Sequence, residues 1–536
     1  MTVVVGVNAG HGAFHDPSAC VVVDGMPRAF VELERISRVR HAPGVRLPAA
    51  AVAHALDVAG VNVGDVDAVA VGWDEPRMAA QHGAGWTASS EKELLDGLGF
   101  PGPVRPEVQF VAHHRAHAAV AFHASGYEQA AVVVVDGNGE DEAISMFRAV
   151  RGGALVRLAV WPQTYSLGHM YEAVSGWLGL GKRGAGKTMG LAAYDTTAGG
   201  DPGWLTVDAA LLRSVLGDDP AARYKDLRPR WAAQVAAFTG AAGPRRRPGE
   251  LHHDEQAVRL ASAAQRTVET VVAWLAEKAR RLAGTAELCL AGGVALNCAA
   301  NGRIPGPVYV PPVPHDAGVA LGAAWTLSAP PTPHTMSAYL GSSPGPLPDL
   351  DGLPAAEPSP ERIADLLEAG AVVGVCRGRA EAGPRALCHR SLLALPHAEA
   401  TRDQVNHLKR RELWRPFGPV THRDNAAWWT PIGELDRYML GAAHLTPTGA
   451  ADLPAITHAD NTTRPQRLRP GDEDLICAVL DTLENRGHPP VLLNTSFNGP
   501  GEPIVNTAEQ ALTCARRLGV DALLTDTALI QVAGRR

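Results

Sequence analysis

Four side chains far apart in the chain have the residue types of metal ligands. His113 and His117 in HHRAHAAVAFH are four residues apart, so a helix would place both rings on one face. Histidines at this spacing are more often solvated or structural, but two aspartates strengthen the metal interpretation: Asp136 ends the apolar run AVVVVD, and Asp316 lies in VPHDAGVALGAAW. Two imidazoles and two carboxylates suit a divalent ion such as iron, manganese or zinc better than a closed structural zinc site.

A second chemical feature is the pair His15 and Asp16 in FHDPSA. The ordinary pKa of histidine lies near neutrality, so His15 at the edge of a cleft can act as a base toward a hydroxyl group. A polar pair that only stabilises the turn explains the same two residues equally well.

The stretch Gly181 to Thr188, GKRGAGKT, matches the phosphate-loop pattern GxxxxGK followed by Ser or Thr. A true phosphate loop follows a buried strand and opens a helix of several turns, because the helix N-terminus supplies part of the anion site. Here SGWLGL before the loop is broken by glycine, and TMGLAAYDTTAGGDPG after it soon meets Asp and paired Gly. We therefore interpret the match as coincidental and leave Lys187 as a contact to phosphate or substrate within a Gly-rich loop.

Positive charge gathers in two short stretches near the C-terminus of a chain whose formal net charge is -7. Bidentate arginine suits phosphate, so the clusters predict a site for a small anion, with a solvated basic surface as the alternative. Ser496 and Asn498 in TSFNG follow a predicted strand, where hydroxyl and amide groups can complete a phosphate or carbonyl site. The clustered residues are Arg377, Arg379, Arg385 and Arg390, followed by Lys409, Arg410, Arg411 and Arg415.

Composition restricts the class of protein that carries these residues. A chain of 536 residues predicts two or three domains, and 46% hydrophobic with 20% charged residues is typical of a soluble globular protein. The net acidity argues against nucleic acid as a partner. Seven cysteines without a CxxC pair favour a reducing compartment, and neither a basic leader nor a bilayer-spanning apolar run is evident. The sequence thus predicts a soluble cytoplasmic protein without membrane contact.

Two segments that must position these residues look like copies of one unit. VVVGVNAGHGAFHDPSACVVVDG reads as strand, Gly-rich turn and strand, and AAVVVVDGNGEDEAISMFRAV repeats the pattern. They predict a duplicated α/β domain whose halves each offer a turn to a shared cleft. A long amphipathic helix is predicted between Asp254 and Leu282, whereas residues 196–250 lack periodicity and look like an exposed insertion with a solvated Arg triplet.

A stretch rich in Pro, Gly and Ser separates this domain from a second α/β unit. Residues 341–360 read GSSPGPLPDLDGLPAAEPSP and have no periodicity, which is typical of a linker. Beyond it we expect helix ERIADLLEAG, strand AVVGVC, strand PVLLN and a helix that TAEQ caps at 507–510. We divide the chain into domains at 1–345 and 361–536, with a linker at 346–360.

Taken together, these motifs resemble the NodU-type O-carbamoyltransferases. The resemblance rests on FHDPSACVVVDG, HHRAHA, VVVVDGNGE, GKTMGLAAYD, LAGGVALNCAANG, GPRALCHRS, KRRELWRPFGPV and LLNTSFNGPGEPIV, in this order over nearly the whole chain. It implies an α/β fold with a duplicated actin-like, Kae1-like N-terminal domain and a smaller YrdC-like C-terminal domain. It also implies that carbamoyl phosphate and ATP, with Mg2+, give carbamoyl adenylate in the C-terminal domain. The carbamoyl group would then pass to a hydroxyl of a small-molecule acceptor in the N-terminal domain.

The resemblance also implies roles for single residues. His15 would take the proton of the acceptor. Iron(II) or a similar divalent ion would be held by His113, His117, Asp136 and Asp316. Carbamoyl phosphate and ATP would be bound by Lys409, Arg411, Ser496 and Asn498, with Arg385 and Arg415 beside them. The nucleotide in the N-terminal site would be held by Gly292, Gly293 and Asn297. The chain departs from the family pattern at Ala382, Cys388 and Trp414, which concerns packing rather than charged groups.

Three other functions stay open at this point. Threonylcarbamoyl transfer to transfer RNA would use related folds and predicts an extended basic face. A regulatory ATPase with a genuine phosphate loop would depend on Lys187. A non-catalytic metal or small-molecule binding protein of actin-like fold would have no use for the C-terminal cations. The acceptor is open among amino sugars, deoxysugars and polyketide alcohols, and the oligomeric state is not predicted.

Overall fold

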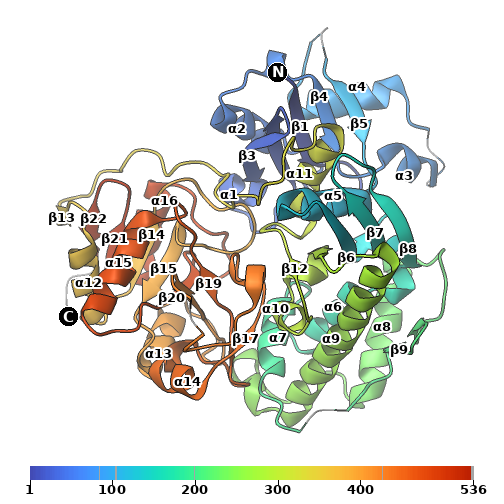
Figure 1. The fold of residues 1–536 in the computed structure, drawn as a ribbon. Coiled ribbons are helices and arrows are strands. Elements are labelled where there is room, and N and C mark those ends of the chain that lie inside the picture. Colours follow the sequence, from blue (N-terminus) through green and yellow to red (C-terminus); the bar gives the residue numbers. More distant parts are fainter. Residues whose placement is uncertain (82, 84, 103–104, 198–199, 425, 533–536) are drawn as a thin grey trace.

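The chain folds into an α/β structure built on three main sheets (Figure 1). The computed structural model describes residues 1–81, 83, 85–102, 105–197, 200–424 and 426–532. Within these residues two sheets have five strands each, a third has eight, and two further sheets are two-stranded. Each main sheet combines parallel and antiparallel pairs, so all three are mixed.

The first sheet has the order β3-β2-β1-β4-β5. Its strands are β1 (Val3–Asn8), β2 (Ser18–Val23), β3 (Met26–Glu32), β4 (Ala68–Val71) and β5 (Glu107–Phe110). The first three pair antiparallel, and β4 and β5 continue the sheet parallel to β1. Helices cover both faces, which explains why VVVGVN is an unbroken apolar run that is buried throughout. The helices of this part are α1 (Leu33–Ser37), α2 (Ala49–Ala59), α3 (Glu75–Gln81) and α4 (Ala88–Leu98).

The second sheet repeats the strand order and directions of the first. Its strands are β6 (Gln129–Gly139), β7 (Glu142–Val150), β8 (Val156–Pro162), β11 (Leu288–Ala291) and β12 (Val308–Tyr309), in the order β8-β7-β6-β11-β12. The first three pair antiparallel, and β11 and β12 continue parallel to β6. The connection from β1 to β2, which carries His15, therefore corresponds to the connection from β6 to β7, just after Asp136.

Two helices, α5 (His113–Ser125) and α11 (Val319–Leu327), lie packed together between these sheets (Figure 1). The sequence of α11, VALGAAWTL, is almost entirely apolar, as expected for a buried helix. It packs on β1, β2 and β4, while α5 packs on β6 and β11. A Cβ atom on Gly322 would lie 1.8 Å from the carbonyl oxygen of Ala116, so only glycine permits this close crossing.

We expect Gly322→Ala to lower the free energy of unfolding by about 3 kcal/mol, because the added methyl group must push two packed helices apart. Gly176 provides a matched control, since it is exposed in α6 (Leu167–Trp177) and has open space where a Cβ would lie. Gly176→Ala should stabilise the protein by up to about 1 kcal/mol. Chemical denaturation measures both changes, and an unaltered midpoint for Gly322→Ala would contradict the close crossing.

The predicted long helix is confirmed as α9 (Glu255–Ala283), with Asp254 as its N-cap. Leu282, the last residue of the predicted helix, is 47% exposed, because the buried stripe continues four residues after Ala279, at Ala283. The helices α6, α7 (Ala185–Ala192) and α10 (Cys298–Gly302) pack against α9.

The insertion at 196–250 is not the wholly exposed segment that its weak periodicity predicted. Its helix α8 (Tyr224–Thr239) buries Leu227, Trp231 and Val235, a stripe too narrow to give a clear pattern. A hairpin of β9 (Leu205–Val207) and β10 (Leu212–Ser214) adds Leu205 and Leu212 to the core. Residues 198 and 199 of the insertion lie outside the described residues. The Arg triplet at 245–247 is exposed, as predicted.

The C-terminal sheet has the order β13-β22-β21-β14-β15-β20-β16-β19. One face carries α12 (Pro360–Glu368) and α15 (Asp474–Asn485), and the other carries α13 (Glu399–Leu408) and α16 (Ala508–Leu518). The strands are β13 (Ala355–Ala356), β14 (Val373–Cys376), β15 (Arg390–Ala394), β16 (Gly418–Thr421), β19 (Gln466–Arg467), β20 (Leu492–Ser496), β21 (Ala522–Leu524) and β22 (Leu529–Gln531). The predicted strands and helices of this unit are therefore present. The remaining α-helix is α14 (Pro447–Asp452), and β17 (Ala443–His444) pairs with β18 (Thr462–Thr463).

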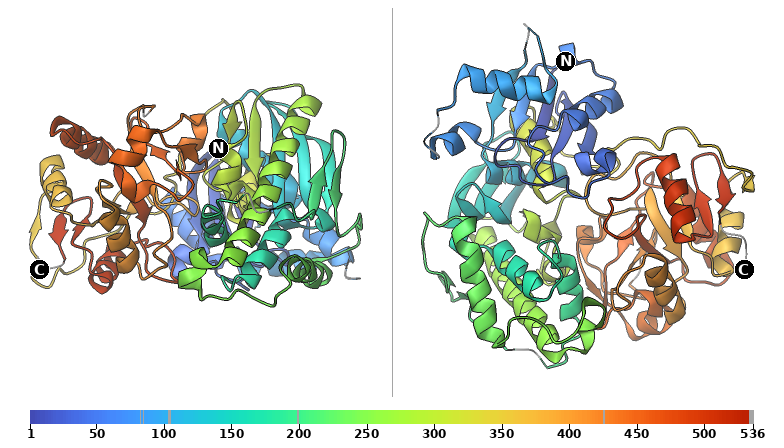
Figure 2. Two further views of the ribbon diagram at one scale, coloured as in Figure 1. Left: turned by 90° about the horizontal axis from the view of Figure 1, so that it is seen from below. Right: turned by 180° about the vertical axis from the view of Figure 1, so that it is seen from behind.

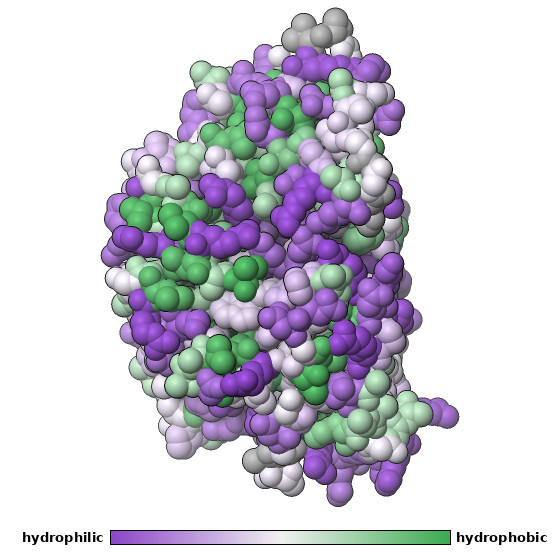
Figure 3. Space-filling view, turned by 90° about the vertical axis from the view of Figure 1, so that its right-hand side faces the viewer, coloured by the Kyte–Doolittle hydropathy of each residue, from purple (hydrophilic) through white to green (hydrophobic). Residues whose placement is uncertain are grey.

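The predicted linker runs along the outside of the C-terminal unit, which lies beside the two N-terminal sheets (Figures 1 and 2). Residues 346–354 form no helix or strand, but Ala355 and Ala356 pair with β22 and so belong to the edge of the C-terminal sheet. All seven cysteines are free. No helix among the described residues is long and apolar enough to cross a membrane. On the face shown in Figure 3, small hydrophobic areas are separated by hydrophilic side chains.

Candidate active site

The four predicted metal ligands converge at one largely buried point beside the second sheet. His113 and His117 come from the start of α5, Asp136 from β6, and Asp316 from the short helical turn before α11. Their donor atoms all lie within 4.8 Å of one another. The Nε2 atoms of the two histidines are 3.0 Å apart, and Asp136 Oδ2 lies 3.3 Å from that of His113 and 3.5 Å from that of His117.

This donor set fits a divalent cation. Ligand atoms about 2.1 Å from an ion lie about 3.0–3.4 Å from one another, close to the observed spacings. His113 donates from Nδ1 to the carbonyl oxygen of Gly72 at 3.2 Å, which leaves its Nε2 as a lone-pair donor toward the cluster. A cation between the two Nε2 atoms would let both act as lone-pair donors at this distance. The carboxylates of Asp136 and Asp316 need the same positive charge, because both are largely removed from water.

Backbone groups fix the carboxylate of Asp136 in this cluster. Its Oδ1 accepts hydrogen bonds from the N–H groups of Gly137 at 2.8 Å and Gly293 at 3.0 Å. Gly292 has a φ of 89°, and a Cβ there would lie 2.2 Å from the carbonyl oxygen of Val135, so the double-Gly turn is shaped to approach β6. Asn297, which was predicted to join this turn in nucleotide binding, caps α10 and pairs with the amide of Gln265.

His15 lies at the edge of the ligand cluster. Its Nδ1 is 2.8 Å from Asp16 Oδ2, and its Nε2 is 4.0 Å from Asp316 Oδ2. The side chain is 47% exposed, so a molecule from solvent can reach the ring. Burial alone would lower the pKa of His15, but the hydrogen bond to Asp16 and the charge of Asp316 raise it to about 9. The structure thus brings together the predicted base and the four predicted metal ligands.

In the C-terminal unit Lys409, Ser496 and Asn498 form one hydrogen-bonded group. Lys409 Nζ donates to the carbonyl oxygens of Ser496 and of Asn498, the latter at 2.9 Å, and to Asn498 Oδ1 at 3.1 Å. Ser496 Oγ donates to the same Oδ1 at 2.7 Å. Burial, followed by the charge of Arg411, holds the pKa of Lys409 well below its ordinary value. All three acceptors of Lys409 are neutral oxygens, and Lys409 forms no ion pair within the described part of the chain.

Arg385, Arg411 and Arg415 lie close to Arg464, which the sequence did not single out. Burial is the largest cause that lowers the pKa of all three arginines, and the charge of Arg464 lowers it further. The pKa of Arg385 falls to about 9. Arg411 stacks over the ring of Phe417 at 4.0 Å. Arg385 reaches the carbonyl oxygen of Leu296 at 3.5 Å and so faces the N-terminal half. A group of like charges of this kind is stabilised by a polyanionic ligand.

The other arginines of the first basic stretch donate hydrogen bonds to backbone oxygens. Arg390 is fully buried and donates to backbone oxygens of Asn506, Arg377 and Ser342. Arg379 donates to backbone oxygens of Gly341, Leu340 and Arg28, and Arg377 to that of Thr525. Because their guanidinium groups hold loops together, the first stretch was wrongly interpreted as one anion-binding cluster, and only Arg385 is left to face a ligand.

The GKRGAGKT loop does not have phosphate-loop geometry. It follows helix α6 rather than a strand, and α7, which begins within it at Ala185, has only eight residues. Lys187 Nζ donates to Glu412 Oε1 at 2.6 Å, and Glu412 also lies 3.6 Å from Arg415. Lys187 therefore joins the N-terminal half to the basic loop at 409–415.

Comparison with known proteins decides the family. Models described as Carbamoyltransferase N-terminus and Carbamoyltransferase C-terminus match residues 86–325 and 364–532. The nodulation protein NolNO of Sinorhizobium fredii is 31% identical over 96% of this chain and 79% of its own length. The chain belongs to the carbamoyltransferase family. This carbamoyltransferase is accordingly a transferase enzyme.

One further relative and one solved structure are also similar to the carbamoyltransferase. The 3'-hydroxymethylcephem-O-carbamoyltransferase of Amycolatopsis lactamdurans is 28% identical over 96% of this chain and 97% of that protein. The crystal structure of HypF from T. kodakarensis overlaps with a TM-score of 0.36 at 13% identity, covering 61% of this chain and 48% of that one.

Several side chains that support the carbamoyltransferase site were not predicted. Trp73 stacks on His113 with ring centres 3.7 Å apart and donates to Asn8 Oδ1 at 2.8 Å. Asn8 in turn donates to the carbonyl oxygen of Asp16 at 2.9 Å, which fixes the turn that carries His15. His41 Nδ1 lies 2.7 Å from Asp16 Oδ1. In the sequence, Asn8 could have been noticed as a polar residue at the end of an apolar strand. No sequence pattern marks Trp73 or His41 as part of the site.

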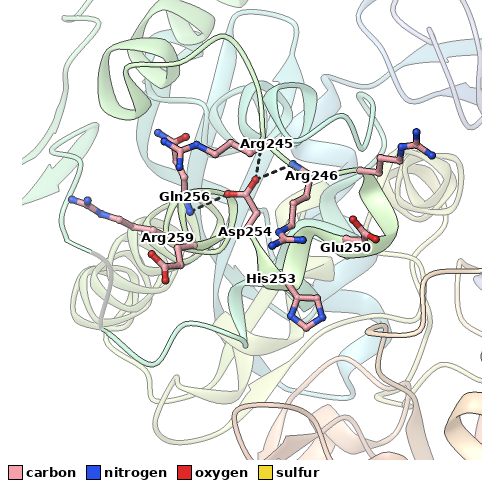
Figure 4. A pocket seen from close by; sticks show the side chains of 9 residues that line it. Arg245, Arg246, Glu250, His253, Asp254, Gln256 and Arg259 are labelled. Carbon is pink, nitrogen blue, oxygen red and sulfur yellow. Dashed lines mark hydrogen bonds between the residues drawn. The ribbon is translucent and has the colours of Figure 1, made fainter.

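A cavity of about 750 Å³ lies where the insertion meets the start of α9 (Figure 4). Asp254 occupies its centre and accepts from the backbone N–H groups of Arg245 at 2.7 Å and Arg246 at 3.1 Å. The side chains of Arg246 and Arg259 extend to different sides in Figure 4. Because these cations do not converge, we assign no ligand to this cavity.

Proposed function

We propose that this carbamoyltransferase makes carbamoyl adenylate and transfers its carbamoyl group to a hydroxyl of a natural product. The chain would divide into a Kae1-like, actin-type domain at 1–345, a linker at 346–360 and a YrdC-like domain at 361–536. The equal strand orders of the two N-terminal sheets support the duplicated, actin-like assignment. The cephem O-carbamoyltransferase among the relatives supports a small-molecule hydroxyl acceptor.

The first step belongs to the C-terminal site. Water cleaves carbamoyl phosphate to carbamate and phosphate, and a carbamate oxygen then attacks the α-phosphorus of ATP. A new O–P bond forms, the bond to the β-phosphate breaks, and pyrophosphate leaves with Mg2+ as its counterion. Lys409, Arg411 and Arg415 would hold the phosphates, while Ser496 and Asn498 would orient the carbamoyl group. The burial of Lys409 together with Arg385, Arg411 and Arg415 supports this assignment, and of these arginines Arg415 also pairs with Glu412.

The second step belongs to the N-terminal site. The acceptor oxygen attacks the carbamoyl carbon, the bond from that carbon to the AMP oxygen breaks, and the acceptor's proton passes to His15. Asp16 accepts from His15 Nδ1 and so keeps Nε2 as the proton acceptor. A divalent ion such as iron(II), held by His113, His117, Asp136 and Asp316, would stabilise negative charge on the phosphate or the attacked carbonyl oxygen. The amides of Gly292 and Gly293 and the side chains of Asn297 and Lys187 would line the nucleotide's path.

One observation carries this proposal: a single chain holds both a buried His–Asp donor cluster beside His15 and a cation-lined Lys409–Ser496–Asn498 group. A screen of hydroxylated natural products by mass spectrometry tests the transfer. We expect a carbamoyl-sized mass gain on one alcohol that requires both ATP and carbamoyl phosphate. A matching gain on transfer RNA, with none on small alcohols, would contradict the proposal.

We expect His15→Ala to slow transfer by about 10²- to 10⁴-fold while carbamoyl adenylate formation continues. A base acts only when unprotonated, so wild-type transfer should rise with pH through the pKa of His15. A divalent ion bound by Asp316 would offset part of the increase that the carboxylates cause in the pKa of His15. This pKa should therefore lie between 6.5 and about 9. Single-turnover transfer rates at several pH values measure this rise, and His15→Ala should show no such rise.

His11→Ala is the control, since His11 lies on the same connection but is exposed and pairs with Glu75. Its transfer rate should still rise with pH as in the unaltered enzyme. Loss of both chemical steps in His15→Ala would contradict the division of labour between the two sites.

A further inference from the structure

One short segment of the N-terminal half, residues 32–42, contacts both sites, and we call it the 32–42 segment. It comprises the end of β3, helix α1 and the turn to Ala42. Toward the N-terminal site, Glu34 Oε2 accepts from the backbone N–H of His41 at 2.7 Å. His41 Nδ1 in turn lies 2.7 Å from Asp16 Oδ1, and Asp16 Oδ2 holds His15. The position of this segment therefore affects the orientation of the His15 ring, because the Asp16 carboxylate contacts both His41 and His15.

Toward the C-terminal unit, the same segment holds Gly383 from two sides. The N–H of Gly383 donates to Glu32 Oε2 at 3.1 Å, and its carbonyl oxygen accepts from Arg35 Nη2 at 2.7 Å. Glu32 and Arg35 are 5% and 4% exposed, so these bonds are shielded from water. Gly383 precedes Arg385 by two residues, and the segment thereby fixes the loop that carries this cation.

Arg38 reaches a second loop of the C-terminal unit. Its Nη1 donates to the carbonyl oxygen of Ile504 at 2.6 Å, and its Nη2 to that of Pro503 at 2.8 Å. The preceding residue, Glu502, accepts at its carbonyl oxygen from Asn498 Nδ2 at 2.8 Å. A two-pronged guanidinium contact therefore holds the loop to which Asn498 is hydrogen-bonded.

Backbone strain is concentrated in and beside this segment. Arg38, His41 and Ala42 have φ values of 58°, 61° and 36°, and Asp16 has 53°. Residues other than glycine rarely adopt this left-handed region. Such conformations persist only where surrounding contacts hold them, and they gather at functional and switching regions. The contacts of Arg38 and His41 at the two ends of this turn provide that support.

We propose that the 32–42 segment couples the two sites and that Arg38 is its positioning residue. The proposal rests on the proposed function, because it presumes that carbamoyl adenylate made in one site is consumed in the other. While Arg38 holds the loop at 503–504, the turn to His41 keeps Asp16 and His15 aligned for the arriving intermediate. When this contact is lost, water replaces the acceptor: its oxygen attacks the carbamoyl carbon, the bond to AMP breaks, and carbamate and AMP leave.

The test is the number of AMP molecules formed per carbamoylated acceptor. In Arg38→Ala this ratio should rise about tenfold over wild type, the order expected when hydrogen bonds from a charged donor are lost. Acceptor-free pyrophosphate exchange is measured alongside; AMP and carbamoylated acceptor both come from the same adenylate, so slower adenylate formation alone leaves their ratio unchanged. Val39→Ala is the matched control, since Val39 is the next residue and 54% exposed. A ratio in Arg38→Ala equal to that in Val39→Ala would overturn the proposal.

A second variant separates coupling from a local structural effect. His41→Ala should raise the same ratio, and combining it with Arg38→Ala should raise it no further than the larger single change, because both act along one path. A multiplicative increase in the double variant would overturn the shared path. Absence of pyrophosphate exchange in the unaltered enzyme is a different result, since it overturns the proposed function itself. Thermal melting confirms that each variant is folded.

Discussion

Lys409→Ala is expected to form carbamoyl adenylate about 10²- to 10³-fold more slowly than the unaltered enzyme. The substitution removes the ammonium group that three oxygens of Ser496 and Asn498 hold in place. It also removes one hydrogen-bond donor from each of these oxygens, so the loop at 496–498 loses part of its support, although Ser496 Oγ still donates to Asn498 Oδ1. Pyrophosphate exchange driven by carbamoyl phosphate, without any acceptor, measures the effect.

Lys225→Ala is the control for this prediction, because Lys225 is exposed on α8 in the N-terminal half. It should exchange pyrophosphate at the unaltered rate. Transfer from separately supplied carbamoyl adenylate should survive in Lys409→Ala, since the N-terminal site is intact. Undiminished exchange in Lys409→Ala would remove this residue from the first step.

His117→Ala is expected to lose the bound divalent ion and to slow transfer by about 10³-fold or more. The substitution removes one of the four metal ligands. It also removes the imidazole that lies beside the carboxylates of Asp136 and Asp316. Elemental analysis of the purified protein should give one ion per chain before the change and none after it. Chelation of the unaltered protein should lower its melting temperature, because an ion that binds only the folded state stabilises it.

His123→Ala is the matched control on the same helix, because His123 lies in the last turn of α5 and outside the ligand cluster. It should retain the ion. Pyrophosphate exchange should continue in both variants, since the C-terminal site holds its own cations. Full metal content in His117→Ala would contradict the assignment of these ligands.

Regular elements could be predicted from the sequence because their periodicity is local. The unbroken apolar runs of β1 and β6 gave two buried hairpins, and helical spacing gave α9 to within one residue at each end. His113, His117 and Asp136 were predicted to meet because a helix start and a strand end carry side chains in known directions. Asp316 was predicted as the fourth ligand, and it reaches the cluster because Gly322 permits the close packing of α11 on α5.

Contacts between irregular loops could not be predicted in the same way. Arg464 joins Arg385 and Arg415 across long stretches of sequence, and no period marks it. Lys187 appeared to belong to a phosphate loop, yet it pairs with Glu412. The Arg377, Arg379 and Arg390 side chains looked like ligand-binding cations, whereas backbone oxygens accept their hydrogen bonds. Composition counts charges, but only the folded chain shows which of them lack a partner.

Acceptor-free pyrophosphate exchange in the unaltered enzyme tests the central claim most directly. The protein, loaded with its divalent ion, is incubated with ATP, Mg2+, labelled pyrophosphate and carbamoyl phosphate. Two reactive centres in one chain predict that label enters ATP only when carbamoyl phosphate is present, and that carbamoyl adenylate accumulates. Folded, metal-loaded protein that incorporates no label and forms no adenylate would contradict the account.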